Sequence, residues 1–393
     1  MDVVFRTDAS LTIGQGHVMR CLALVEALRE HGAAVSFVCR ELGGHLFDLI
    51  EAQGVTVNRL PAPKAGTQAN DISAYAVGLE ATWQEDARQT SAAIAASGKT
   101  PDWLVVDHYD LDARWETALR PYAKRLMIID DLANRKHDCD ALVDPTYGET
   151  AERYRGLLPS RAYCLSGSQY ALLRPQFRHQ RQSPGRSVPR AEDSRVHVFF
   201  GGTDSGNHTI RFSRLLLEHV GGVQICAVLG RSCVQYDQLR SLATEYDGRF
   251  SWKTDVQDMA ASMAGCDFAL GAPGGATWER ACIGLPAVYV AVSSSQAAIL
   301  ERLRSNELCA YLGMANDISD QAFVDGVQGF FADRSSLEVM RAHGMQAVDG
   351  NGVVRVAAFL EGKGDYDSCV GGSGPALDSL WRRARCANRH LAE

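Results

Sequence analysis

Residues 3–20 read VVFRTDASLTIGQGHVMR and set the pattern that later parts of the chain repeat. A short apolar run at 3–5 leads into a polar turn that carries Gly14 and Gly16, and apolar residues then recur at helical spacing from Val18 to Leu28. The pattern predicts a strand, a turn and a helix. In an open α/β sheet such a turn lies at the carboxyl edge, where ligands usually bind. We therefore expect a ligand site here.

The same turn holds a histidine, His17. Glycines at 14 and 16 permit close approach of the backbone to a ligand, and the amides at a helix start favour anions. The motif G-x-G-H differs from the dinucleotide fingerprint because Met19 stands where the third glycine belongs. Two interpretations of His17 stay open at this point: a side chain that acts on a ligand, and a histidine that caps the helix.

Length and composition narrow the class of protein. A chain of 393 residues favours two domains, and a net charge of −7 without a long basic run before residue 360 argues against nucleic-acid binding. Eleven scattered cysteines suggest reduced thiols rather than disulfides or a zinc site, so we expect no metal. No segment reaches the roughly 20 apolar residues of a membrane helix, and charged residues interrupt the first apolar stretch where a signal peptide would lie. We expect a soluble, cytoplasmic protein without stable membrane insertion.

Strands and helices alternate through the first part of the chain. Apolar runs at 34–39, 55–57, 103–106, 126–129 and 141–144 predict strands, and a long helix is expected over 74–96. Polar residues follow several of these runs, notably Asp107-His108-Tyr109 and Asp130-Asp131. The pattern is typical of a doubly wound parallel sheet. We assign residues 1–165 to an N-terminal Rossmann-like domain.

A composition shift at 174–195, rich in Arg, Gln, Ser and Pro, predicts a linker, which we place at 166–194. A second alternating series follows, with strands expected at 196–200, 224–229, 268–270 and, as the last one, 287–292, and with helices to about 360. We assign residues 195–362 to a C-terminal α/β domain and expect the two α/β domains to face a cleft. The tail, 363–393, is basic and either touches a partner or membrane surface or is solvated.

Two glycine turns mark the second domain. Gly201-Gly202 and Gly274-Gly275 each precede a predicted helix, where backbone amides can hold a diphosphate. Such turns also occur without a ligand, but the pair, with Thr203 and Thr277 close by, favours a nucleotide diphosphate. Glu279 follows in the first turn of its predicted helix and could accept hydrogen bonds from both ribose hydroxyls; the alternative is a carboxylate that complements the helix dipole.

Several motifs occur together in the order seen in one enzyme family: Gly16-His17-x-x-Arg20, Asp107-His108-Tyr109, Ile129-Asp130-Asp131, Gly201-Gly202-Thr203-Asp204, Gly274-Gly275-x-Thr277-Trp278-Glu279 and Asp349-Gly350-x-Gly352. Over residues 1–360 the chain resembles the UDP-2,4-diacetamido-2,4,6-trideoxy-β-L-altropyranose hydrolases of pseudaminic acid biosynthesis. The resemblance implies a two-domain glycosyltransferase-B (GT-B) fold. It also implies a catalytic histidine at His17 and a nucleotide site at Gly274, Gly275, Thr277 and Glu279. The chain departs from the family at Asp144-Pro145-Thr146 and at Ser294-Ser295-Gln296.

The resulting prediction is a hydrolase that releases UDP from a UDP-amino-deoxy sugar without a cofactor. A neutral histidine suits proton transfer near pH 7, so His17 is the expected base. Asp8, Asp107 and His108 are candidates to orient His17 or the attacking water. The expected substrate-binding residues are Gly14, Gly16, Arg20, Gly201, Gly202, Thr203, Gly274, Gly275, Thr277, Glu279 and Gln296. A glycosyltransferase and a noncatalytic nucleotide-sugar-binding protein are the alternatives, because a fold alone does not decide the activity.

Overall fold

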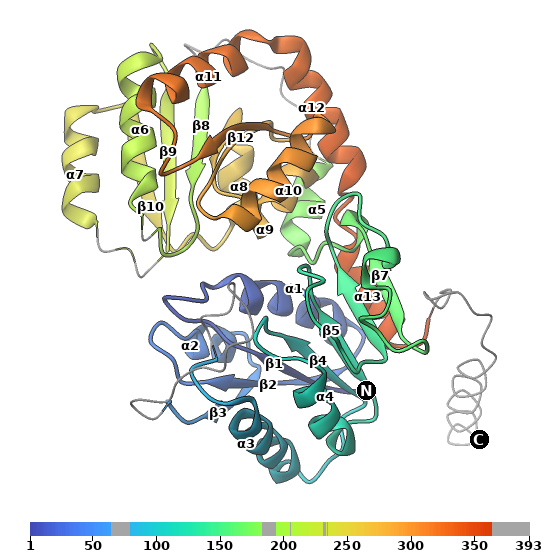
Figure 1. Cartoon of the computed structure of the whole chain (residues 1–393). Helices are drawn as coiled ribbons and strands as arrows, with labels where there is room; N and C mark the ends of the chain where they lie inside the picture. Colours follow the sequence, from blue (N-terminus) through green and yellow to red (C-terminus); the bar gives the residue numbers. More distant parts are fainter. Residues whose placement is uncertain (64–78, 183–193, 205, 231–232, 234, 364–393) are drawn as a thin grey trace. The chain divides into compact units, whose positions relative to one another are not determined.

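The computed structural model describes residues 1–63, 79–182, 194–204, 206–230, 233 and 235–363. Contacts divide the chain into two compact units, which are described separately (Figure 1). The first unit contains Met1–Ile13, Cys21–Leu172 and the chain from Gly352 onward. The second unit contains Gly14–Arg20 and Leu173–Asn351. In the described part of the chain, no helix combines the length and the apolar character needed to cross a bilayer.

A seven-stranded sheet forms the centre of the first unit, with every neighbouring pair parallel. In spatial order the strands are β3 (Thr56–Leu60), β2 (Ala34–Arg40), β1 (Asp2–Thr7), β4 (Trp103–Asp107), β5 (Leu126–Ile129), β6 (Ala141–Asp144) and β7 (Tyr163–Ser166). The helices of this unit are α1 (Gly16–Glu30), of which residues from Cys21 onward belong here, α2 (Phe47–Ala52), α3 (Trp83–Ala96), α4 (Ala113–Leu119) and α13 (Gly352–Leu360). Short 3-10 turns are η1 (Arg120–Tyr122), η2 (Ala151–Tyr154) and η3 (Ser168–Tyr170). Strands β4, β5 and β6 are buried throughout, as expected for parallel strands covered on both faces.

The second unit repeats the arrangement with a six-stranded parallel sheet. Its spatial order is β10 (Phe250–Thr254), β9 (Gln224–Leu229), β8 (Arg195–Phe199), β11 (Phe268–Gly271), β12 (Ala287–Ala291) and β13 (Ala310–Met314). Its helices are α5 (Pro175–Arg181), α6 (His208–His219), α7 (Tyr236–Glu245), α8 (Met259–Ala264), α9 (Gly275–Cys282), α10 (Ser294–Ser305), α11 (Asp320–Ala332) and α12 (Arg334–Ala347). Phe212 on α6 packs against Phe323 on α11, with ring centroids 4.6 Å apart, inside the apolar core.

Each sheet reverses its strand order once, and these positions matter for ligand binding. The order 3-2-1-4-5-6 recurs in both units, so the reversal falls between β1 and β4 in the first and between β8 and β11 in the second. Ligands of open α/β sheets bind beyond the carboxyl ends of the strands at such a switch point. The predicted α/β class with two Rossmann-like domains is confirmed.

Three strands were missed in the sequence: β7, β10 and β13. All three lie at sheet edges. In β10 only Phe250 is buried and exposed residues alternate with half-buried ones, while β13 is half-buried throughout. An edge strand has neighbours on one side only, so it lacks the continuous apolar run of a central strand. The prediction that 287–292 holds the last strand was therefore wrong. The helix expected over 74–96 begins at Trp83, capped by Thr82; residues 74–78 of that prediction lie outside the described ranges.

The unit boundaries also differ from the predicted ones at two places. Part of the predicted 166–194 linker is helix α5, whose Phe177 is fully buried in the second unit. Helix α13, placed in the second domain from sequence, groups with the first unit. Its carbonyl at Leu360 accepts the indole N–H of Trp103 at 2.9 Å, and a side chain at Gly352 would overlap the carbonyl of Ala171. Most of the predicted tail, from residue 364, lies outside the described residues.

Candidate functional site

The turn after β1 is shaped by its own backbone contacts. Ser10 accepts the N–H groups of Thr12 and Ile13 on its hydroxyl oxygen, at 3.2 and 2.9 Å. Gly14 has φ of +83°, which a residue with a side chain rarely adopts. Helix α1 then begins at Gly16, so His17 is the second residue of the helix and its backbone amide lies at the helix start. The turn has the geometry expected of a ligand-binding strand-to-helix connection.

His17 contacts Arg20 one turn further along α1. The guanidinium Nη2 of Arg20 lies 3.3 Å from Nδ1 of His17. A guanidinium has no acceptor, so in this contact Nδ1 accepts and a neutral His17 carries its hydrogen on Nε2. His17 can take a proton at Nδ1 only when Arg20 leaves it. Arg20 was predicted as a substrate-binding residue, and the structure adds this direct contact with the predicted base.

Asp8, at the carboxyl end of β1, lies in a fully buried group of charged and polar side chains. One oxygen of its carboxylate is 2.7 Å from Nη1 of Arg6 and also accepts the backbone N–H of Arg40 at 2.7 Å. The other oxygen is 3.3 Å from Nε2 of His108. Burial by itself would raise the pKa of Asp8, but Arg6 and the hydrogen bond from His108 outweigh it and hold that pKa well below its usual range. Asp8 is thus a permanent carboxylate in the folded protein.

His108 is engaged through both ring nitrogens. Its Nδ1 accepts the N–H of Asp110 at 3.1 Å, so the hydrogen of the neutral ring is on Nε2, the atom that lies 3.3 Å from Oδ2 of Asp8. Neither nitrogen is available to take a proton from water without breaking a contact. The structure thus joins two of the predicted residues, Asp8 and His108, at the β1/β4 switch point. Their contacts fit a positioning role.

A second buried carboxylate, Asp86 on α3, completes this group. It receives Nη2 of Arg6 and Nη2 of Arg40, each at 2.6 Å, and the indole N–H of Trp115 at 2.9 Å. Arg6, Arg40 and Asp86 are not among the site residues predicted from sequence. A charge inside the apolar strand at Arg6 was the available signal for the first, whereas nothing in the helical pattern of α3 marks Asp86 as buried.

Asp107, the third predicted orienting residue, ends strand β4 and is fully buried. The thiol of Cys21 on α1 lies 3.6 Å from its Oδ2. Beside it, Tyr109 donates its hydroxyl to Asp131 at 2.6 Å, which links the ends of β4 and β5. The polar residues that follow these strands in the sequence therefore meet at one edge of the sheet, as their pattern predicts.

In the second unit the turn at Gly201-Gly202 differs from the expectation. Gly201 has φ of +99°, and Gly202 accepts the N–H of Gly230 at 3.0 Å, an approach so close that a side chain at 230 would overlap Gly202. Helix α6, however, starts only at His208. Asp204 already accepts the N–H groups of His208 and Thr209, at 3.0 and 2.9 Å. The start of α6 therefore has its own carboxylate, and any diphosphate contact here is limited to the loop that contains Thr203.

The turn at Gly274-Gly275 leads directly into α9. Gly274 has φ of +154°, and α9 begins at the next residue. The hydroxyl of Thr277 accepts the N–H of Gly274 at 3.1 Å, and the N–H of Thr277 donates to the carbonyl of Gly274 at 2.9 Å. The amides of Gly275 and Ala276 remain at the helix start, where a helix offers them no acceptor. With the positive end of the helix dipole, they are the kind of donors that can bind an anion at the β8/β11 switch point.

Glu279 lies in the second turn of α9, not in the first as predicted, because the helix starts at Gly275. Its carboxylate is 3.2 Å from Nη2 of Arg174, and its side chain is 17% exposed. Burial raises the pKa of Glu279 in spite of the charge of Arg174. The position in the second turn argues against a carboxylate that only complements the helix dipole. A ribose hydroxyl that bonds to Glu279 must compete with Arg174 for the carboxylate.

Gln296, near the start of α10, also belongs to this edge. Its side chain accepts the N–H of Val292 at 2.9 Å and donates to the carbonyl of Pro273 at 3.3 Å. Both ends of its amide are thus used to join the end of β12 to the Gly274 turn.

Among the described residues, no three His, Cys, Asp or Glu side chains gather in a way that could hold a metal ion.

Two Rossmann-like α/β units with these strand orders define a GT-B fold, and solved structures agree. MurG from Acinetobacter baumannii superposes with a TM-score of 0.62 at 13% identity, over 92% of this chain and 99% of that one. UGT71G1 from Medicago truncatula, complexed with UDP-glucose, superposes with a TM-score of 0.61 at 11% identity, over 92% of this chain and 98% of that one. At these identities the likeness establishes the fold.

Sequence relatives are distant, and no family model matches the chain. An uncharacterized protein, MJ1062 of Methanocaldococcus jannaschii, is 22% identical over 295 residues, which is 74% of this chain and 55% of that protein. The UDP-2,4-diacetamido-2,4,6-trideoxy-beta-L-altropyranose hydrolase of Campylobacter jejuni is 24% identical over 213 residues, 54% of this chain and 65% of the hydrolase. The spore coat polysaccharide biosynthesis protein SpsG of Bacillus subtilis is 21% identical over 224 residues, which is 56% of this chain and 64% of SpsG. The matches span less than two thirds of each relative's length.

Proposed function

We propose that this protein hydrolyses a UDP-amino-deoxy sugar, and specifically that it releases UDP from UDP-2,4-diacetamido-2,4,6-trideoxy-β-L-altrose, a step in pseudaminic acid biosynthesis. The observation that carries the proposal is the start of α9 at the β8/β11 switch point, where the amides of Gly275 and Ala276 meet the positive end of the helix. Such a site suits a diphosphate. The distant relative from C. jejuni, whose name states this substrate, supports the choice of sugar.

The amides at α9 would serve the leaving group. When the bond between C1 of the sugar and the diphosphate oxygen breaks, its electron pair stays with UDP, which gains negative charge. Backbone donors and a helix dipole already aimed at that position stabilise the developing charge without reorganisation. The second unit therefore provides both nucleotide binding and leaving-group stabilisation in this mechanism.

His17 would take the proton of the attacking water. A water oxygen forms a bond with C1 on the face opposite UDP, and its proton goes to Nδ1 of His17. In the structure Arg20 contacts that nitrogen at 3.3 Å. A guanidinium binds phosphate groups strongly, so the anionic substrate draws Arg20 away and leaves Nδ1 ready to accept. Direct attack at C1 gives inversion at the anomeric carbon, as in inverting glycosidases.

Asp8 and His108 act as positioning residues in this proposal. Because Asp8 stays ionised and His108 stays bound to it, the pair fixes the ends of β1 and β4. Asp107 is the remaining candidate to orient water, since it ends β4 at the same edge. These roles keep the single proton transfer at His17.

The decisive experiment is an NMR time course on the UDP-altrose substrate in water enriched in ¹⁸O. The expected products are free sugar that carries the label at C1, with the inverted anomer formed first, and unlabelled UDP. Label on UDP would mean attack at phosphorus and would overturn the mechanism. UDP binding without any turnover across a panel of UDP-amino sugars would instead point to a noncatalytic binding protein.

A glycosyltransferase is the second candidate, because transferases are among the structures that share the fold. In that case His17 would deprotonate an acceptor hydroxyl rather than water. Release of UDP would then be slow in buffer and would accelerate with an added acceptor. A rate that is independent of any acceptor favours hydrolysis.

A further inference from the structure

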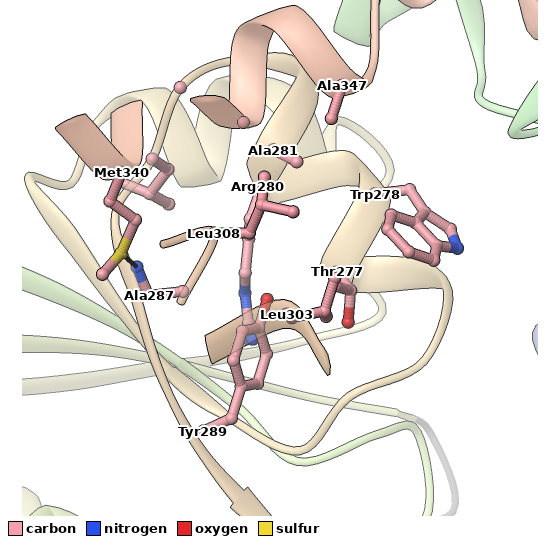
Figure 2. Close-up of a pocket in the computed structure, with 13 residues that line it drawn as sticks. Thr277, Trp278, Arg280, Ala281, Ala287, Tyr289, Leu303, Leu308, Met340 and Ala347 are labelled. Atoms are coloured by element: carbon pink, nitrogen blue, oxygen red, sulfur yellow. Dashed lines mark hydrogen bonds between the residues drawn. The ribbon is translucent and has the colours of Figure 1, made fainter. Parts of the chain in front are cut away.

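Arg280 lies beneath the two glycine turns of the second unit and is fully buried. It projects from α9 toward the sheet, and Figure 2 shows its side chain extending to the ring of Tyr289, with Thr277 beside it. The guanidinium carbon is 5.2 Å from the centre of that ring. The sequence analysis did not include Arg280 among the site residues.

The guanidinium of Arg280 joins two strands where they separate. Its Nη2 donates to the carbonyl of Phe199 at 3.2 Å and approaches the carbonyl of Leu270 at 3.5 Å. Phe199 ends β8 and Gly271 ends β11, and these two residues are the last pair of the parallel ladder. Beyond this pair β8 leads to Gly201-Gly202 and β11 leads to Gly274-Gly275. One side chain thus connects the origins of both turns.

Gly271 makes this contact possible. A Cβ on Gly271 would overlap the carbonyl oxygen of Phe199 and crowd Nη2 of Arg280 at 2.7 Å. The absence of a side chain lets the strands stay close and lets the guanidinium reach between them. The glycine and the arginine therefore form one device at the β8/β11 switch point.

The charge of Arg280 is not balanced by an acidic side chain through these bonds, because both strand acceptors are main-chain carbonyls. Its sequence neighbour Glu279 pairs with Arg174 instead. The buried ring of His197 on β8 stays neutral, since burial and the charge of Arg280 lower its pKa to about 3. Arg280 thus places a positive charge, partly offset by that of Glu279, at the base of the switch point. In a region of low dielectric such a charge attracts an anion more strongly than it would in water.

We propose that Arg280 is a positioning residue for the diphosphate: it holds the two glycine turns at a fixed separation and adds positive potential beneath them. This inference rests on the proposed nucleotide function. It assigns the recognition of the diphosphate group, rather than of uridine, to the strand fork made by Phe199, Gly271 and Arg280.

The test compares UDP with uridine, which lacks the diphosphate, using calorimetry for UDP and ligand-observed NMR for uridine. The Arg280→Lys variant keeps a cation, but its side chain is one atom shorter and lacks the guanidinium whose Nη2 contacts both carbonyls. We expect its affinity for UDP to fall about ten-fold or more, while its affinity for uridine stays within about two-fold of the parent. Gly271→Ala, which forces the strands apart while Arg280 is kept, should give the same selective loss.

A matched control separates positioning from stability. Leu303 lines the same small cavity as Arg280 and is buried, so Leu303→Ala should lower Tm while leaving the ratio of UDP to uridine affinity unchanged. Circular dichroism sets a temperature at which each variant is folded. Equal losses for UDP and uridine, or an unchanged UDP affinity in Arg280→Lys, would overturn the inference. If the parent itself does not bind UDP, the proposed function fails first, and the two failures are thereby distinguished.

Discussion

Nε2 of His108 lies 3.3 Å from Oδ2 of Asp8, and Nδ1 of the same ring accepts the N–H of Asp110. The pair joins the ends of β1 and β4. Because both nitrogens are used, His108 holds Asp8 in place and leaves proton transfer to another group. The first predictions follow from these separate roles for Asp8 and for His17.

Replacing His17 by asparagine should lower turnover by about two to four decades, which is the usual contribution of a general base. Affinity for UDP should stay close to the parent value, because the mechanism assigns the diphosphate to the start of α9 and not to His17. Assays quenched at fixed times with the UDP-amino sugar give the turnover number, and calorimetry gives the UDP dissociation constant. Near-parental turnover in the variant would remove His17 from the mechanism.

The carboxylate of Asp8 should contribute stability that is lost in acid. Its folded pKa is held below the usual range by Arg6 and His108 against the opposing effect of burial, whereas an unfolded aspartate has a pKa of about 3.9. Below pH ~4 the unfolded chain therefore binds a proton that the folded chain does not, so the free energy of unfolding decreases as the pH is lowered. Urea unfolding should show a gap between the parent and Asp8→Asn that narrows as the pH drops below ~4. A constant gap would contradict the ion-pair assignment.

Asp144 at the end of β6 should show the opposite slope. Burial raises its pKa to about 6, although hydrogen bonds from Thr146 and the charge of Arg153 act against that rise. Between pH ~4 and 6 the folded chain holds a proton that the unfolded chain has lost, so stability falls as pH rises. The free energy of unfolding of the parent, relative to Asp144→Asn, should drop by on the order of 2 kcal/mol from pH 4 to 7. A flat difference across that window would show that the carboxyl titrates normally.

Thr277→Val should weaken UDP binding by releasing the start of α9. The variant keeps the shape of the side chain but loses the hydroxyl that accepts the N–H of Gly274 at 3.1 Å. Loss of such a cap costs about 1 kcal/mol of stability, and we expect a drop of roughly five-fold in UDP affinity. Thr277→Ser retains the hydroxyl and is the matched control. The hypothesis fails if valine and serine variants bind UDP equally well.

Glu279→Ala should weaken binding of UDP by about one to two decades if the carboxylate accepts the ribose hydroxyls. A 2′,3′-dideoxy UDP analogue should bind parent and variant alike, because it cannot donate those bonds. Arg174→Gln removes the ion pair of Glu279 at 3.2 Å, so in that variant UDP affinity should hold or rise. An equal loss for both nucleotides in Glu279→Ala would reduce Glu279 to a structural charge.

Local pattern predicted the central part of both sheets. Runs such as 103–106 and 126–129 became buried strands because a parallel strand covered on both faces needs apolar residues throughout. The turns at Gly14 and Gly274 were identifiable because positive φ values select glycine. Edge strands such as β13 were not predicted, because a half-buried strand can carry polar as well as apolar residues and so lacks a continuous apolar run.

The sequence by itself determined the α/β class, the two sheets and the polar edges that follow β1, β4, β8 and β11, because these depend on neighbours along the chain. Only the tertiary structure decided which polar residues pair. Asp86 meets Arg6 across 80 positions, and Arg280 reaches Phe199 across 81 positions. Burial of a charge depends on partners brought together by folding, and the spacing of residues along the chain carries no record of those distances.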